Sequence, residues 1–185
     1  MKTRKFLKLT TAIVAVTGLG VAWLSRAGTG NKTNDDPEAK EITFSEFKQL
    51  EANPAVIEPI KLSNEDWQKH LSRSQYHVLR RAGTERPGSS HLNQEKRDGE
   101  YACAGCGLSL FKSDTKFESG TGWPSFFQPI EGRMGESTDF KIGYPRTEYH
   151  CIRCKGHQGH VFKDGPRPTG LRYCNNGVAL NFVPA

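Results

Sequence analysis

A chain of 185 residues, 35% hydrophobic and 25% charged, has room for one domain of ordinary size and a tail. Its formal net charge of +6 is concentrated in residues 1–27, which hold five basic residues and no acidic one. The remainder carries 21 basic and 20 acidic residues, and this near-neutral balance argues against a nucleic-acid partner. We also expect the small, nearly neutral domain to be a monomer.

The N-terminal residues have the pattern of a targeting segment. A basic start at 1–8 precedes an uncharged apolar run at 9–24. A run of about 16 residues suits a signal peptide, and Ser25-Arg26-Ala27 offers a cleavage site. We expect 1–27 to be a cleaved signal peptide or, as the alternative, an anchor attached to the membrane through 9–24. Either places the domain outside the cytoplasm, in the periplasm or on the extracytoplasmic face of the membrane if the source is bacterial.

The next segment, 28–60, is predicted to be a linker and an N-terminal arm. Residues 28–40 are small and polar, too poor in apolar side chains to offset the entropy cost of ordering them. Residues 41–60 mix apolar positions with prolines, which indicates a short helix and an extended arm on the domain surface.

Two short helices are expected before residue 90. Ser63 is suited to cap the first, and Ser72 with Gln75 three residues later has the capping-box pattern at the start of the second. Gly83 and Pro87 should end the second helix.

The rest of the chain reads as strands and turns. Short apolar and aromatic stretches, separated by Gly and Pro, occupy 108–111, 123–127, 161–162 and 178–182. We therefore predict a mainly β domain over 61–185, with the short helices at its N-terminal edge.

Four of the five cysteines form two CxxC pairs with 44 residues between them, Cys103 with Cys106 and Cys151 with Cys154. Each pair lets two thiolates of one turn reach a tetrahedral ion, so together they predict a structural zinc site with one Zn²⁺ per chain. Two structural disulfides are an alternative in an oxidising compartment, and a redox CxxC is another. Zinc is favoured because one four-cysteine set accounts for both pairs.

The remaining cysteine is the candidate nucleophile. Cys174 lies two residues after Arg172 and two before Asn176, so on a strand the three side chains would project to one face. A nearby positive charge favours the reactive thiolate. The alternative is a buried cysteine without a chemical role.

Three further residue types complete the candidate site. His157 and His160 offer acid catalysis, with Asp164 shortly after them, although histidines at this spacing also serve in structure. Trp123, in a glycine-flanked turn, offers a rigid indole face for a small apolar group or, alternatively, packs in the core.

In these features the chain resembles the B-type methionine sulfoxide reductase family over roughly residues 63–184. Besides the CxxC pairs, the shared blocks are GTERP (83–87), KFESGTGWPSF (116–126), HQGHVF (157–162), DGP (164–166) and RYCNN (172–176). The resemblance implies two antiparallel β-sheets and a zinc site remote from the catalytic cleft. It also implies thiol-dependent reduction of protein-bound methionine (R)-sulfoxide, which repairs oxidised proteins under oxidative stress.

The resemblance assigns a role to each candidate residue. Cys174 would attack the sulfoxide sulfur and become a sulfenic acid, while His160 protonates the oxygen. Trp123 would hold the S-methyl group, with Phe126 also in the substrate-binding set. The others would orient the water and acid network (His157, Asp164 and Asn176) or favour the thiolate (Arg172).

The chain departs from the family pattern at two positions. Thr121 stands where many members have a resolving cysteine, so we expect an external thiol donor, such as a thioredoxin-like protein, to reduce the sulfenic acid. Gln158 stands where leucine is common, which alters the expected polarity of the pocket.

Two other functions compete with this interpretation. A non-catalytic zinc module that binds a partner protein would not need Cys174, whereas a thiol oxidoreductase would use the CxxC thiols and exclude a permanent zinc ion.

Overall fold

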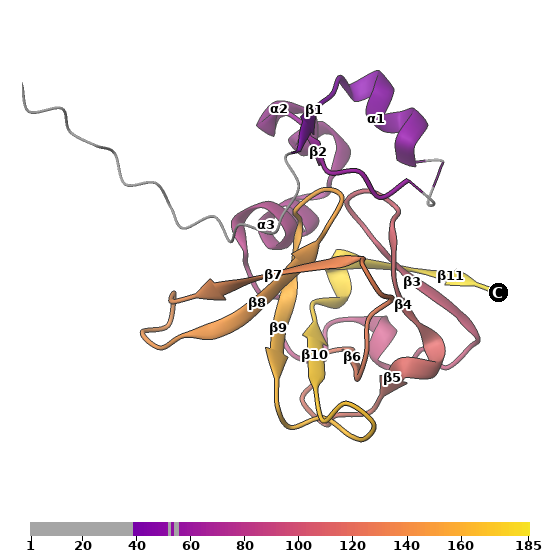
Figure 1. Ribbon diagram of the computed structural model, residues 1–185, viewed down its shortest axis with the longest axis vertical. Helices are drawn as coiled ribbons and strands as arrows, with labels where there is room; N and C mark the ends of the chain where they lie inside the picture. The colour runs from indigo at the N-terminus through magenta and orange to yellow at the C-terminus, as the bar shows by residue number, and fades with distance from the viewer. Residues whose placement is uncertain (1–38, 52, 54–55) are drawn as a thin grey trace, which may run out of the picture. The chain divides into compact units, whose positions relative to one another are not determined.

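The computed structural model describes residues 39–51, 53 and 56–185 (Figure 1). The predicted targeting segment, 1–27, and the linker up to residue 38 lie outside the described residues. Within the part that is described, no helix is both long enough and apolar enough to cross a membrane.

Three short helices precede the main sheets, and the two that the capping residues predicted are confirmed. Ser63 accepts a hydrogen bond from the Asp66 N–H at the start of its helix. Ser72 accepts one from the Gln75 N–H, and the Gln75 side chain accepts one from the Ser72 N–H in return, which completes the capping box. The helices are α1 (Phe44–Glu51), α2 (Asn64–His70) and α3 (Arg73–Arg81).

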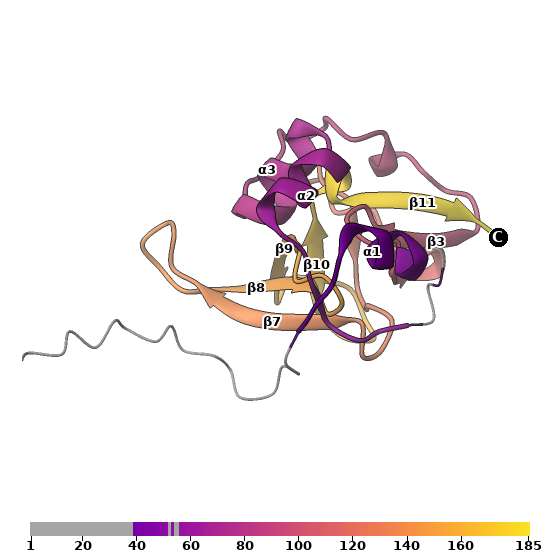
Figure 2. The same cartoon turned by 90° about the horizontal axis from the view of Figure 1, so that it is seen from above.

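Two antiparallel sheets form the body of the domain, which confirms the mainly β fold (Figures 1 and 2). The six-stranded sheet runs in the order β5 (Lys116–Phe117), β6 (Ser125–Phe126), β10 (Arg172–Asn175), β9 (His157–Phe162), β8 (Arg146–Cys151) and β7 (Met134–Asp139). The three-stranded sheet runs in the order β11 (Leu180–Pro184), β3 (Gly99–Cys103) and β4 (Ser109–Lys112). In both views the β7–β8 hairpin projects from the rest of its sheet.

An aromatic core joins the two sheets. Tyr101 and Phe111 come from the small sheet, whereas Phe126 and Tyr149 come from the large one, and all four are fully buried. The Phe111 and Phe126 rings stack with centroids 4.1 Å apart, and the Tyr101 ring meets the Phe126 ring edge-on at 4.9 Å. Burying each such ring contributes about 1.5–3 kcal/mol, which fixes β6 and its neighbour β10 against the small sheet.

The N-terminal arm is tied to the second CxxC turn. Its strand β1 (Lys40–Glu41) pairs in parallel with β2 (Ile60–Lys61), and Phe47 of α1 is fully buried. Arg153, which lies inside the turn and is 1% exposed, donates to the carbonyls of Val56 and Asn53. The arm therefore packs into the domain as well as covering its surface.

Candidate metal centre and active site

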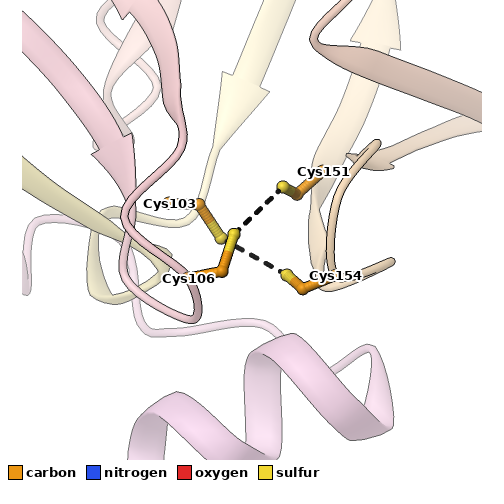
Figure 3. Close-up of side chains that lie close together, drawn as sticks. All are labelled: Cys103, Cys106, Cys151 and Cys154. Atoms are coloured by element: carbon orange, nitrogen blue, oxygen red, sulfur yellow. Dashed lines mark hydrogen bonds between the residues drawn. The ribbon is translucent and has the colours of Figure 1, made fainter. Parts of the chain in front are cut away.

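Both CxxC pairs meet in one buried cluster (Figure 3). Cys103 ends β3 and Cys151 ends β8, and each begins a tight turn that presents its second cysteine, Cys106 or Cys154. The four Sγ atoms lie within 4.8 Å of one another, and all four residues are buried.

The sulfur geometry fits a metal ion better than disulfides. The Sγ atoms of Cys103 and Cys154 are 3.7 Å apart, and those of Cys106 and Cys151 are 3.6 Å apart. A disulfide needs about 2.05 Å, whereas two sulfurs bound at about 2.3 Å to a tetrahedral ion lie roughly 3.8 Å apart. All four cysteines are free, so the donor set and its spacing suit zinc.

The second cluster of predicted residues surrounds Cys174. Cys174 lies on β10 between two neighbouring strands, opposite Ser125 of β6 and opposite His160 of β9. Beside it is a small cavity of about 120 Å³. Four predicted residues, Trp123, His160, Cys174 and Asn176, line it together with Thr84, Arg146, Gly159, Phe162 and Asn175.

Burial dominates the electrostatics of the Cys174 thiol. It raises the pKa of Cys174, while the positive charge of Arg172 and hydrogen bonds from Thr121 and Arg172 lower it only in part. Asp164, which forms two 2.9 Å hydrogen bonds with Arg172, also raises it. Arg172 therefore favours the thiolate, as expected, but burial outweighs it, and the net pKa of Cys174 lies above its ordinary value.

Thr121 ends a short row of hydroxyl groups. Its Oγ1 lies 2.8 Å from the Ser119 Oγ, which lies 2.8 Å from the Ser125 Oγ. Ser125 is fully buried and is the residue paired with Cys174 across the sheet. Thr121 thus supplies a hydrogen-bond donor to the Cys174 sulfur.

His160 is held by a carboxylate that the sequence did not single out. Its Nε2 lies 2.8 Å from the Asp139 Oδ2, and Arg146 donates to the same oxygen at 2.5 Å. Burial lowers the pKa of His160 more than Asp139 raises it, so the imidazole is neutral at pH 7. Burial opposes ionisation of Asp139, but hydrogen bonds from the Lys141 N–H, His160 and Arg146 together hold its pKa well below the usual range.

His157 is buried next to His160, outside the cavity. It is 3% exposed and does not line the cavity; its ring centroid lies 5.4 Å from that of His160. Its Nδ1 is 2.5 Å from the Glu148 Oε1, and this hydrogen bond holds the pKa of Glu148 low despite burial. His157 therefore reaches the cavity only through its neighbour.

Asn176 and Trp123 are locked by the same segment of chain. The Asn176 Oδ1 accepts a hydrogen bond from the Glu85 N–H at 2.9 Å, and the Trp123 Nε1 donates to the Glu85 carbonyl at 3.2 Å. The Glu85 carboxylate in turn accepts from the backbone N–H groups of Gly177 and Val178. Glu85 belongs to the GTERP block, but no role for it was predicted.

Besides His157, three predicted residues do not line the cavity: Arg172, Asp164 and Phe126. Phe126, expected in substrate binding, is fully buried between the two sheets because its strand turns that side chain toward Tyr101 and Phe111. The Asp164 side chain is 62% exposed; it pairs with Arg172, and its negative charge raises the pKa of Cys174.

Together these features define a class of protein, a mainly β protein with a cysteine thiol beside a small pocket and a separate cluster of four buried cysteines suited to a metal ion. The SelR domain family matches residues 71–184. The chain is 55% identical over 126 residues to a peptide methionine sulfoxide reductase MsrB of Methanosarcina barkeri, covering 66% of this chain and 87% of that protein.

Other relatives agree in name and extent. An MsrB of Leptospira interrogans is 53% identical over 126 residues, which cover 66% of this chain and 95% of the Leptospira protein. An MsrB of Pseudomonas putida strain W619 is 52% identical over 129 residues, which cover 69% of this chain and 97% of the Pseudomonas protein. The chain therefore belongs to the MsrB family of peptide methionine sulfoxide reductases, which confirms the family and the enzyme class predicted from the sequence.

Proposed function

We propose that this enzyme reduces protein-bound methionine (R)-sulfoxide by passing the sulfoxide oxygen to Cys174. The observation that carries the proposal is the position of the Cys174 thiol beside a cavity of about 120 Å³, lined also by Trp123 and His160. The indole face of Trp123 suits the S-methyl group, and only the end of one side chain fits in such a volume.

The chemical step transfers one oxygen atom and two electrons. Cys174 attacks the sulfoxide sulfur, the sulfur–oxygen bond breaks, and the oxygen ends on the cysteine as a sulfenic acid while methionine leaves. The sulfoxide is reduced and the cysteine sulfur is oxidised. A thiol and a sulfoxide give a sulfenic acid and a thioether with no net gain or loss of protons.

His160 moves the proton within this step. A neutral imidazole whose Nε2 faces Asp139 has its Nδ1 available to take the thiol proton from Cys174 and deliver it to the sulfoxide oxygen. The Asp139 carboxylate stabilises the imidazolium that forms in between. The raised pKa of Cys174 and the lowered pKa of His160 both favour this neutral starting state.

An external thiol then restores the cysteine. The other four cysteines form the four-cysteine cluster, and the side chain that hydrogen-bonds to Cys174 from the predicted position of a resolving cysteine is that of Thr121. A first donor thiol forms a mixed disulfide with Cys174 and releases water, and a second donor thiol frees Cys174 and leaves as the donor disulfide. A thioredoxin-like dithiol protein has the chemistry for both steps. The exported location remains part of the proposal and is supported by residues 1–27 alone.

The preferred substrate is a sulfoxide within a polypeptide. Because the cavity admits a single side chain, residues flanking the sulfoxide must contact its rim. The β7–β8 turn is joined to residues near the cavity at both of its ends: Lys141 donates to the carbonyls of Arg81 and Ala82, two positions before cavity residue Thr84, and Arg146, which follows the turn, lines the cavity. The same turn exposes three large apolar side chains: Phe140 (66%), Ile142 (51%) and Tyr144 (58%).

The four-cysteine cluster is proposed to hold one structural Zn²⁺ per chain. A closed set of four thiolates leaves no open position for substrate, so the ion would supply stability rather than chemistry. It would join the end of β3 to the end of β8 and so couple the two sheets.

Trapping the oxidised cysteine tests the proposed step. The purified chain is treated with an (R)-sulfoxide peptide in the absence of any thiol, then with dimedone, and the labelled residue is found by peptide mass spectrometry. We expect one methionine formed per chain and one dimedone adduct, on Cys174. Methionine formed with the adduct on a CxxC cysteine, or with no adduct, would contradict the assignment.

A further inference from the structure

Gln158 is the second position at which the sequence departs from the family pattern. It lies in β9 and is fully buried, but it does not line the cavity beside Cys174. Its Nε2 donates a 3.3 Å hydrogen bond to the Sγ of Cys103, and its Oε1 accepts a 3.2 Å hydrogen bond from the Asn175 Nδ2. The expectation that Gln158 alters pocket polarity is therefore wrong, because its side chain faces the metal cluster.

The surrounding hydrogen bonds determine whether the nitrogen or the oxygen of the Gln158 amide faces the Cys103 sulfur. The Asn175 Nδ2 also donates to the carbonyl of Asn176 at 2.8 Å, so the nitrogen of that amide must face this carbonyl and the neighbouring Gln158. Its Oδ1 accepts from the Tyr149 hydroxyl at 2.8 Å. Gln158 must then offer oxygen to Asn175, which leaves its N–H groups for Cys103.

We infer that Gln158 supports the metal site without binding the ion itself. It donates an N–H···S hydrogen bond to the Cys103 thiolate and links this ligand to Asn175 on β10, the strand that carries Cys174. The inference rests on the proposed occupancy of the cluster by zinc. Hydrogen bonds to a charged acceptor are roughly twice as strong as neutral ones, and residues that orient metal ligands commonly change metal affinity 10- to 100-fold. A leucine at this position would have no donor.

The same residue also reaches the catalytic side. The Gln158 carbonyl accepts hydrogen bonds from both the backbone N–H and the side-chain Nδ2 of Asn176, each at 2.9 Å. Asn176 lines the cavity next to Cys174. One buried residue therefore contacts a metal ligand with its side chain and a pocket residue with its backbone, so the two centres are positioned together.

Zinc release tests the inference. Gln158→Met keeps the length of the side chain but removes its donor, whereas Tyr149→Phe removes a hydrogen bond from the far end of the same buried network. Both zinc-loaded full-length variants are mixed with excess chelator, and zinc transfer is followed by absorbance. We expect Gln158→Met to lose zinc about 10-fold faster than the unmodified chain, and Tyr149→Phe to match the unmodified chain. Equal rates in all three, or equal acceleration in both variants, would overturn the inference.

Cadmium substitution gives a direct spectroscopic check. In ¹¹³Cd-loaded, ¹⁵N-labelled protein, a through-bond correlation between cadmium and the Gln158 side-chain N–H is expected, and its absence in a folded sample contradicts the hydrogen bond. Metal content and (R)-sulfoxide turnover of the unmodified chain are measured alongside. A zinc-free chain would refute the proposed metal and this inference together, whereas a zinc-loaded but inactive chain would refute the proposed reaction and leave the release comparison intact.

Discussion

The imidazole of His160 and the carboxylate of Asp139 are joined by a 2.8 Å contact between Nε2 and Oδ2. Asp139 ends β7 and His160 lies on β9, so the contact reaches across the intervening strand β8. Arg146 donates to the same oxygen from the other arm of the β7–β8 hairpin. The orientation of His160, the residue proposed to transfer the proton, thus depends on the β7–β8 hairpin. The turn of this hairpin also carries the exposed side chains of Phe140, Ile142 and Tyr144.

Asp139→Asn is expected to slow the chemical step. The amide keeps the size of the side chain but cannot stabilise the imidazolium at His160, so kcat should fall about 100-fold while KM changes little, within the usual range for general acid–base catalysis. Steady-state turnover of an (R)-sulfoxide peptide measures both constants. An unchanged kcat would mean that the Asp139 carboxylate does not assist His160 in the reaction.

The same carboxylate should make stability depend on pH. Because the pKa of Asp139 is lower in the folded chain than its unfolded value of about 3.9, its stabilising effect is complete above that value and is lost as pH falls toward the folded pKa. Chemical unfolding between about pH 5 and pH 2 should show a steeper loss of unfolding free energy in the unmodified chain than in Asp139→Asn. Parallel curves would contradict the low pKa.

Alkylation of Cys174 should report its raised pKa. Only the thiolate reacts with iodoacetamide, so the rate should rise about 10-fold per pH unit and keep rising where an ordinary cysteine, of pKa about 8.5, levels off. Thr121→Val removes a hydrogen bond to the sulfur and should slow the reaction several-fold at pH 8, whereas Thr121→Ser should not. A plateau below pH 8 would contradict the dominance of burial.

Polar substitution of the β7–β8 turn should separate polypeptide from small substrates. Phe140→Ser with Ile142→Ser removes two exposed apolar contacts outside the cavity, so kcat/KM should fall several-fold for an oxidised unfolded protein. For a blocked methionine sulfoxide amino acid it should stay within about twofold. Equal losses on both substrates would mean that the turn supports the fold or the site and does not bind polypeptide.

The sequence predicted those features that depend on neighbours along the chain. The caps at Ser63 and Ser72 and the four zinc-type cysteines follow local patterns, and the structure places each as expected. Asp139 was missed because only the pairing of β7, β8 and β9 brings it to His160. Gln158 was misread for a related reason, since the sequence of β9 does not reveal that its side chain meets Cys103.

Phe126 shows the limit of reasoning by proximity. It lies three residues after Trp123, yet Trp123 lines the cavity while Phe126 fills the core between the sheets. Side chains on a strand alternate between its faces, and which face is buried depends on the second sheet, whose place the sequence alone does not give.

The central claim, that Cys174 reduces the R-epimer of methionine sulfoxide, is tested most directly with the separated epimers of a blocked methionine sulfoxide. The purified chain and its Cys174→Ser variant are each assayed with dithiothreitol, after zinc content and folding are checked. We predict turnover of the R-epimer alone and its complete loss in the variant. Turnover of the S-epimer, activity that survives Cys174→Ser, or no turnover by a folded, reduced, zinc-loaded chain would contradict the account.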